Sequence, residues 1–136
     1  MKVLLTGASG FIGASLTRLL VSEGCRVHAL ARPGSNLERI QDLSGGALSI
    51  ELGDVLTPDQ MTQVVARVQP ELCFHLAWYA EPGVYQTSPL NIPYVAASLD
   101  LASQLAAAGC RRLVVAGTCA EYDADNGYLA ESSPTR

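Results

Sequence analysis

The fold of this chain is decided by residues 2–22, which read KVLLTGASGFIGASLTRLLVS. Residues 2–6 form an apolar run typical of a β-strand, and residues 11–22 repeat apolar side chains at the spacing of a helix. Glycines stand at positions 7, 10 and 13, at the junction of the strand and the helix. A glycine cluster in this setting predicts a dinucleotide-binding site.

Each glycine of this motif has a separate physical role. Gly7 permits the tight turn, Gly10 lets the backbone approach a pyrophosphate, and Gly13 lets the helix pack closely on the strand. The N-terminus of the helix then presents free N–H groups and a partial positive charge to the phosphates. The alternative is a glycine-rich turn that holds no ligand.

Apolar runs and helical patterns alternate along the rest of the chain. This alternation predicts an α/β fold, a doubly wound parallel sheet of the Rossmann type with strand order 3-2-1-4-5 and helices on both faces. A length of 136 residues fits one domain, residues 1–136. The expected strands are 2–6, 26–31, 48–52, 72–76 and 113–117, and the expected helices are 11–22, 35–43, 57–68 and 89–108.

Local signals define the helices further. Ser35 with Glu38, and Thr57 with Gln60, predict capping boxes for the second and third helices. In the first helix, the apolar residues Ile12, Leu16, Leu19 and Leu20 fall on one face.

The composition narrows the class of protein. Asp and Glu number 13 against 9 Lys and Arg, for a net charge of −4, and 49% of the residues are apolar. Such a chain is neither disordered nor a basic nucleic-acid platform, and no apolar run approaches the roughly 20 residues that span a bilayer. The cysteines stand far apart, which favours reduced thiols in a cytoplasmic protein, and no metal-ligand spacing is present.

Four further motifs follow the glycine motif along the chain. They are Leu52-Gly53-Asp54-Val55, His75-Leu76-Ala77, Ala116-Gly117-Thr118-Cys119-Ala120-Glu121-Tyr122-Asp123 and Glu131-x-x-Pro134. With the glycine motif and in this order, they resemble the extended short-chain dehydrogenase/reductase family, which comprises nucleotide-sugar epimerases, dehydratases and ketoreductases. The resemblance runs through the whole chain. It implies that Asp54 contacts the adenine, that Leu76 and Ala77 lie beside the cofactor ribose, and that Thr118 hydrogen-bonds the reacting sugar oxygen.

The residue after the second strand bears on the choice of cofactor. An acidic side chain there holds the ribose 2′-hydroxyl of NAD, whereas an arginine accommodates the 2′-phosphate of NADP. Here the residue is Arg32, followed by Ser35 and Asn36 as neutral donors. We therefore expect NADP, with NAD as the alternative cofactor. The predicted cofactor contacts are Gly7, Ser9, Gly10, Phe11, Ile12, Gly13, Arg32, Ser35, Asp54, Val55, Leu76 and Ala77.

Simpler interpretations stand beside these. Arg32 can be a solvated surface side chain, and Asp54 an ordinary turn residue. His75 fits a half-buried structural role better than that of a base. Trp78 and Tyr79 follow the fourth strand at its carboxyl end, where they either line the substrate pocket or pack under a loop.

The catalytic residues are represented only in part. In the resembled family, dehydratases carry Asp-Glu directly after the residue that matches Thr118, whereas Cys119 and Ala120 stand here, at the edge of the substrate pocket. Epimerisation or ketone reduction is therefore favoured over dehydration. The family's Tyr-x-x-x-Lys pair is missing, since Lys2 is the only lysine.

We therefore expect the NADP(H)-binding portion of a nucleotide-sugar epimerase or 4-ketoreductase, truncated before the tyrosine. The alternatives are a non-catalytic dinucleotide-binding module and an unrelated doubly wound domain with a chance glycine turn. Strand 113–117 is an apolar sheet edge, so homo-oligomers are expected unless the polar tail 121–136 covers it.

Overall fold

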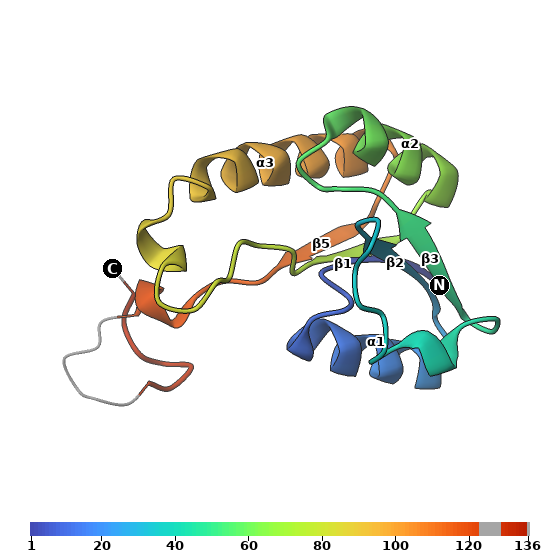
Figure 1. Ribbon diagram of the computed structural model, residues 1–136, viewed down its shortest axis with the longest axis horizontal. Coiled ribbons are helices and arrows are strands. Elements are labelled where there is room, and N and C mark those ends of the chain that lie inside the picture. Colours follow the sequence, from blue (N-terminus) through green and yellow to red (C-terminus); the bar gives the residue numbers. More distant parts are fainter. Residues whose placement is uncertain (123–128, 136) are drawn as a thin grey trace.

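The computed structural model describes residues 1–122 and 129–135, in which five parallel strands form a sheet in the order β3-β2-β1-β4-β5 (Figure 1). The predicted fold class and strand order are confirmed. β4 ends one residue, and β5 two residues, before the predicted ends. The strands are β1 (Lys2–Thr6), β2 (Arg26–Ala31), β3 (Leu48–Leu52), β4 (Leu72–His75) and β5 (Arg112–Val115).

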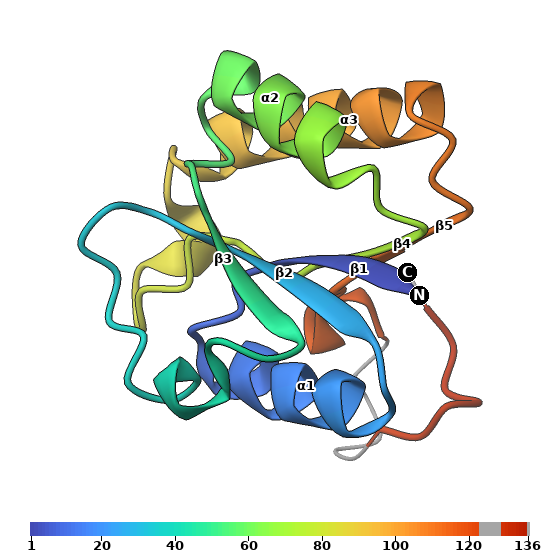
Figure 2. The same cartoon turned by 90° about the vertical axis from the view of Figure 1, so that its right-hand side faces the viewer.

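Three α-helices cover the two faces of the sheet within the described residues. α1 (Phe11–Ser22) lies on one face, and α2 (Pro58–Val68) and α3 (Asn91–Ala107) lie together on the other (Figure 2). None of these helices is long and apolar enough to cross a membrane.

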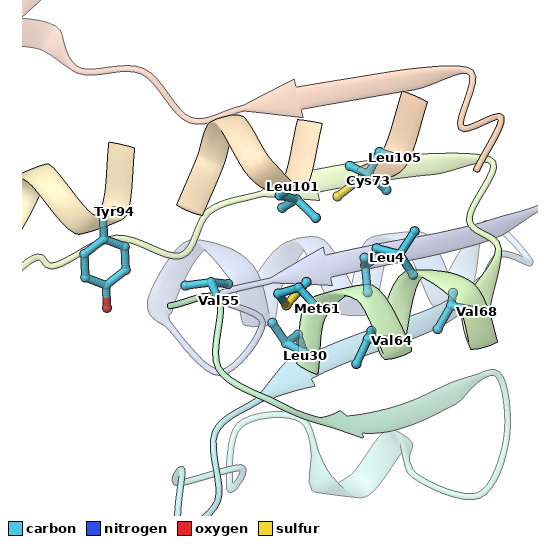
Figure 3. Close-up of a cluster of buried hydrophobic side chains, with 11 residues drawn as sticks. Leu4, Leu30, Val55, Met61, Val64, Val68, Cys73, Tyr94, Leu101 and Leu105 are labelled. Atoms are coloured by element: carbon cyan, nitrogen blue, oxygen red, sulfur yellow. The ribbon is translucent and has the colours of Figure 1, made fainter. Parts of the chain in front are cut away.

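Two apolar clusters fill the space between these layers. Successive side chains of β1 point to opposite faces, so Val3 and Leu5 pack under α1 while Leu4 packs under α2 and α3. Figure 3 shows the second cluster, where Leu4 lies beside Val64 and Val68 of α2. All three strand side chains are fully buried, which explains why the central strand is a continuous apolar run.

The expected helix over residues 35–43 does not form. The segment consists of turns that end in the short 3₁₀ helix η1 (Gln41–Leu43). The Asn36 side-chain oxygen accepts the Glu38 N–H at 2.8 Å, a local bond that competes with helical hydrogen bonding. Full burial of Ile40 in the core then anchors the segment, and a tertiary contact overrides the capping signal.

The capping box predicted at Thr57 is also wrong. The Thr57 side chain makes no capping bond, and Gln60 instead accepts the N–H of Asp54 at 2.9 Å. Helix α2 nevertheless begins at Pro58, as predicted. Helix α3 begins at Asn91 instead of residue 89, because the Ser88 hydroxyl accepts the Leu90 N–H before the first helical turn.

The apolar face of α1 identified in the sequence coincides only in part with its buried face. Ile12 and Leu19 are 67% and 56% exposed, whereas Leu20 is buried and Leu16 packs, partly buried, against the core cluster that contains Val3 and Leu5. The helix approaches β1 so closely that small side chains occupy the contact. The buried residues of α1 are Gly13, Ala14, Thr17 and Leu20.

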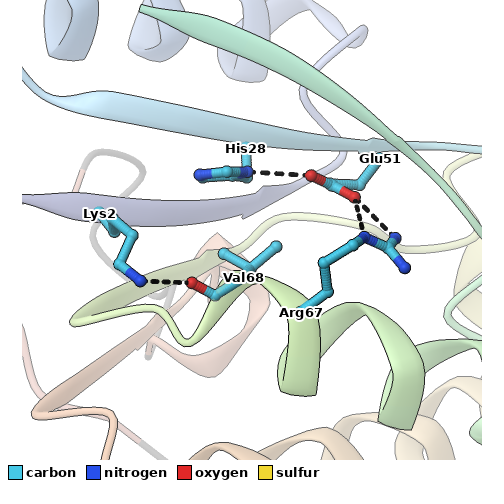
Figure 4. Close-up of polar contacts among 5 residues, drawn as sticks. All are labelled: Lys2, His28, Glu51, Arg67 and Val68. Carbon is cyan, nitrogen blue, oxygen red and sulfur yellow. Dashed lines mark hydrogen bonds and ion pairs between the residues drawn. The ribbon is translucent and has the colours of Figure 1, made fainter.

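Polar contacts tie the layers together at the side of the sheet that carries β2 and β3. Glu51 of β3 bonds His28 of β2 at 2.9 Å and Arg67 of α2 at 2.7 Å, and the Lys2 ammonium donates to the carbonyl of Val68 (Figure 4). Burial opposes ionisation of Glu51, but the hydrogen bonds from His28 and Arg67 outweigh it and lower the pKa of that carboxyl. These contacts join β2 and β3 to α2, so their role is structural.

Candidate functional site

A cleft of about 280 Å³ opens at the carboxyl ends of β1, β2 and β4. The parallel register sets Thr6 beside both Leu30 and His75, so the loops that follow the three strands meet at this edge. This is where ligands bind in open α/β sheets. The lining residues are Gly7, Ser9, Gly10, Leu30, Ala31, Arg32, Ser35, Gly53, Asp54, Val55, Leu76, Ala77, Trp78, Ala80 and Tyr94.

The glycine loop forms the floor of the cleft. Gly7 has a φ of 72°, a conformation that favours glycine, and a Cβ there would lie 2.9 Å from the Ala77 nitrogen. A Cβ on Gly13 would lie 2.1 Å from the Gly7 carbonyl oxygen. The predicted roles of these two glycines in the turn and in helix packing are therefore visible in the structure.

The start of α1 suits an anion. Gly10 is the N-cap residue and contributes no capping side chain, so the first N–H groups of the helix are not satisfied by their own cap. These groups and the helix dipole favour a phosphate at the Gly10 end of the cleft. Phe11 and Ile12 lie in the first helical turn beside the cleft, with side chains 82% and 67% exposed.

A buried hydrogen-bond network supports the opposite wall. The Thr6 hydroxyl oxygen accepts the N–H groups of Leu76 and Ala77 at 3.2 and 3.1 Å. The same hydroxyl lies 2.8 Å from His75 Nδ1. Since its oxygen already accepts two bonds, the hydroxyl donates its hydrogen to Nδ1, and His75 carries its proton on Nε2.

The network continues from β4 into α3. His75 Nε2 lies 2.8 Å from the Ser98 hydroxyl, which itself donates to the Tyr94 carbonyl at 2.8 Å. Burial lowers the pKa of His75 below its ordinary value of 6.5. Both ring nitrogens are thus engaged in structural bonds, which supports the structural interpretation of His75 over that of a base.

Asp54 has the contact of a turn residue and also lies on the wall of the cleft. Its carboxylate accepts the Leu56 N–H at 3.0 Å, as a turn residue does, and the residue also lines the cleft. Val55 beside it is buried in the core under α2 and α3 and lines the same cleft. Both residues therefore line the cleft, and the adenine contact that the family resemblance implies for Asp54 stays a prediction.

A larger hollow of about 670 Å³ lies toward β5. Trp78 lines both this hollow and the first cleft, and its indole N–H donates to Asn91 at 3.0 Å. Tyr79 is partly buried against the α2 and α3 core, so the packing interpretation holds for it. The lining residues are Trp78, Tyr85, Gln86, Asn91, Ala116, Gly117, Thr118 and Glu121.

Thr118 follows β5 and faces this hollow together with Glu121. Cys119 is exposed and begins the short 3₁₀ helix η3 (Cys119–Glu121), and it is not among the residues that line the hollow. Glu121 is a residue that motif reading missed, because its place depends on η3. A Cβ on Gly117 would lie 2.9 Å from Glu121 Oε1, so glycine leaves room for this carboxylate.

Other cleft residues were also missed. Ala80 and Tyr94 line it without a sequence signal, because each reaches it only through the loop after β4 or the packing of α3. Among residues 1–122 and 129–135, no group of three His, Cys, Asp or Glu side chains could hold a metal ion. Asp123, the last residue of the motif that begins at Ala116, lies outside the described residues.

Comparison with known proteins agrees with this geometry. The NAD dependent epimerase/dehydratase family matches residues 3–136, and the chain belongs to that family. The dTDP-6-deoxy-L-talose 4-dehydrogenase (NAD(+)) of Aggregatibacter actinomycetemcomitans is 28% identical over 134 residues, which cover 98% of this chain and 47% of that protein. A UDP-glucose 4-epimerase of Streptomyces lividans is 29% identical over 99% of this chain and 41% of its own length.

Solved structures show the same fold. The UDP-glucose 4-epimerase of Bifidobacterium longum, in complex with NAD⁺ and UDP, superposes with a TM-score of 0.84 at 22% identity, over 100% of this chain and 43% of that one. The UDP-glucose 4-epimerase of Thermus thermophilus, in complex with NAD, gives a TM-score of 0.82 at 23% identity, over 100% of this chain and 44% of that one. The chain therefore spans about half the length of these relatives.

Proposed function

We propose that residues 1–136 are the NADP(H)-binding domain of a nucleotide-sugar epimerase or 4-ketoreductase that transfers hydride at a sugar carbon. The observation that carries the cofactor choice is Arg32, which directly follows β2 and lines the cleft. No carboxylate stands among residues 31–36 to hold a free ribose 2′-hydroxyl. Relatives named for NAD and for nucleotide sugars support the wider class.

Different residues of the cleft would bind the different parts of a dinucleotide. Ser9, Gly10 and the start of α1 would hold the pyrophosphate, and Asp54 and Val55 the adenine. Leu76 and Ala77, held in place by the Thr6 hydroxyl, would lie beside a ribose of the cofactor. When bound, the nicotinamide supplies the hydride chemistry that the side chains themselves lack.

The hollow beside β5 would receive the sugar. Thr118 would hydrogen-bond the sugar oxygen that gains or loses a proton, and Trp78 would form the wall shared with the cofactor cleft. Cys119 and Ala120 cannot act as acid and base for water elimination, which favours epimerisation or ketone reduction. In a longer form that carries a Tyr-x-x-x-Lys pair, Thr118→Val should lower turnover strongly and cofactor affinity weakly.

Two further proposals concern the state of the protein. We place it in the cytoplasm, because the spacing of its cysteines suits a reducing compartment. We also propose that it self-associates through β5, which is the edge strand of this chain and exposes Val114 and Val115.

Calorimetric titration with NADPH and NADH tests the cofactor choice. Arg32→Ala should lower NADPH affinity about ten- to a hundredfold, the value of one charge-assisted hydrogen bond, and leave NADH affinity nearly unchanged. Equal losses for both cofactors would refute the role of Arg32. No binding of either cofactor would refute the proposed dinucleotide-binding role of the cleft.

A further inference from the structure

A second hollow, of about 350 Å³, adjoins the cofactor cleft outside the end of β2. It shares Ser9, Gly10, Arg32 and Ser35 with the cleft, so the two are continuous. Its remaining lining residues are Asn36, Glu38 and Arg39. Two arginines, Arg32 and Arg39, therefore line one hollow beside the Gly10 end of α1, together with the acidic residue Glu38.

Arg32 and Arg39 differ in their side-chain contacts from three other arginines of the chain. Arg18, Arg67 and Arg111 each form an ion pair with a carboxylate. Within the described residues, the side chains of Arg32 and Arg39 make no hydrogen bond or ion pair. Two unpaired cations outnumber the single carboxylate on this hollow, which suits an anionic ligand that both arginines can reach.

The position of Arg39 is fixed from two sides. Its neighbour Ile40 is fully buried in the core under α1. Its own carbonyl accepts a bond from Arg18 Nη2 at 2.5 Å, and the same guanidinium holds both oxygens of Asp42 at 2.7 and 2.8 Å. Arg18 of α1 thus holds the loop on both sides of Ile40 and fixes the backbone from which the Arg39 side chain reaches the hollow.

We propose that Arg39 is a second cation for the 2′-phosphate of NADP, and that Arg18 is a positioning residue that acts through Arg39. The inference rests on the proposed NADP function and deepens it. A terminal phosphate on the adenosine ribose carries close to two charges at neutral pH, and Arg32 alone supplies one. Ser35 and Asn36 border the same hollow and add neutral hydrogen-bonding groups.

The test is calorimetry of the 136-residue chain with NADP⁺ and NAD⁺. Arg39→Ala should lower NADP⁺ affinity about tenfold and leave NAD⁺ within about twofold, whereas Arg39→Lys should recover part of the loss. Arg26→Ala is the matched control, because it removes one exposed arginine from the opposite end of β2 and should leave the affinity ratio unchanged. An intact NAD⁺ affinity shows that each variant is folded.

The role of Arg18 is tested by combining variants. Arg18→Ala should reduce the preference for NADP⁺ severalfold, and in the Arg39→Ala background it should add nothing further, because it acts through that side chain. If the natural chain prefers NADP⁺ but Arg39→Ala keeps the full preference, the inference fails and the proposed function stands. If the natural chain binds both cofactors equally, the NADP function fails and the inference with it.

Discussion

Replacing Gly13 by alanine should disrupt the junction on which both the fold and the cleft depend. The new Cβ would lie 2.1 Å from the Gly7 oxygen, 2.8 Å from the Gly7 carbonyl carbon and 2.9 Å from the Ala8 Cα. All three atoms belong to the backbone, so no side chain can move aside. To restore ordinary contact, α1 or the glycine loop must shift by about 1 Å, which a close-packed core resists.

Two opposing effects set the change in the free energy of unfolding that Gly13→Ala should cause. Overpacking of a well-packed site costs about 1–3 kcal/mol and occasionally more. Alanine regains about 0.5–1 kcal/mol over glycine within a helix. Since the overlap involves only backbone, we take the upper end of the cost and expect a net loss of about 2 kcal/mol in the free energy of unfolding, with a Tm lower by roughly 5–10 °C.

Urea titration and calorimetry of Gly13→Ala measure this loss directly. Gly46→Ala is the matched control, because it makes the same chemical change at an exposed site where the nearest atom to the new Cβ lies 3.9 Å away. That variant should differ from the natural chain by less than about 0.5 kcal/mol. If Gly13→Ala is as stable as Gly46→Ala, the proposed close approach of α1 to the loop is wrong.

Three further predictions use the same structure. Gly10→Val should leave the circular dichroism spectrum intact and abolish dinucleotide binding, because its branches would enter the shared lining of the two hollows; normal binding would place the site elsewhere. Stability should fall as the pH drops below about 6.5, since the unfolded chain binds a proton at His75 before the folded chain does, and His75→Gln should flatten this part of the urea-midpoint profile. An unchanged slope in that variant would assign the effect to other groups. Light scattering of the concentrated chain should show dimers or larger species; a stable monomer whose β5 amides exchange freely would contradict association through that edge.

The sequence by itself determined the fold class, the strand order and the edge of the sheet that carries the cleft. These follow from local properties, namely apolar periods of strand and helix and glycines at the turn where a side chain would collide with Ala77. The order of motifs along the chain also placed Asp54 and Thr118 correctly after their strands. Such features are readable because they depend on neighbours within one or two turns of chain.

Only the tertiary structure decided which residues meet across long stretches of sequence. The Thr6 contact with His75 joins residues 69 positions apart, and the clamp from Arg18 to Asp42 spans 24. The same kind of contact buried Ile40 and kept residues 35–43 from forming a helix. No local pattern carries these contacts, because each forms only when packing of the layers brings two distant segments together and the energy gained exceeds the local helical preference.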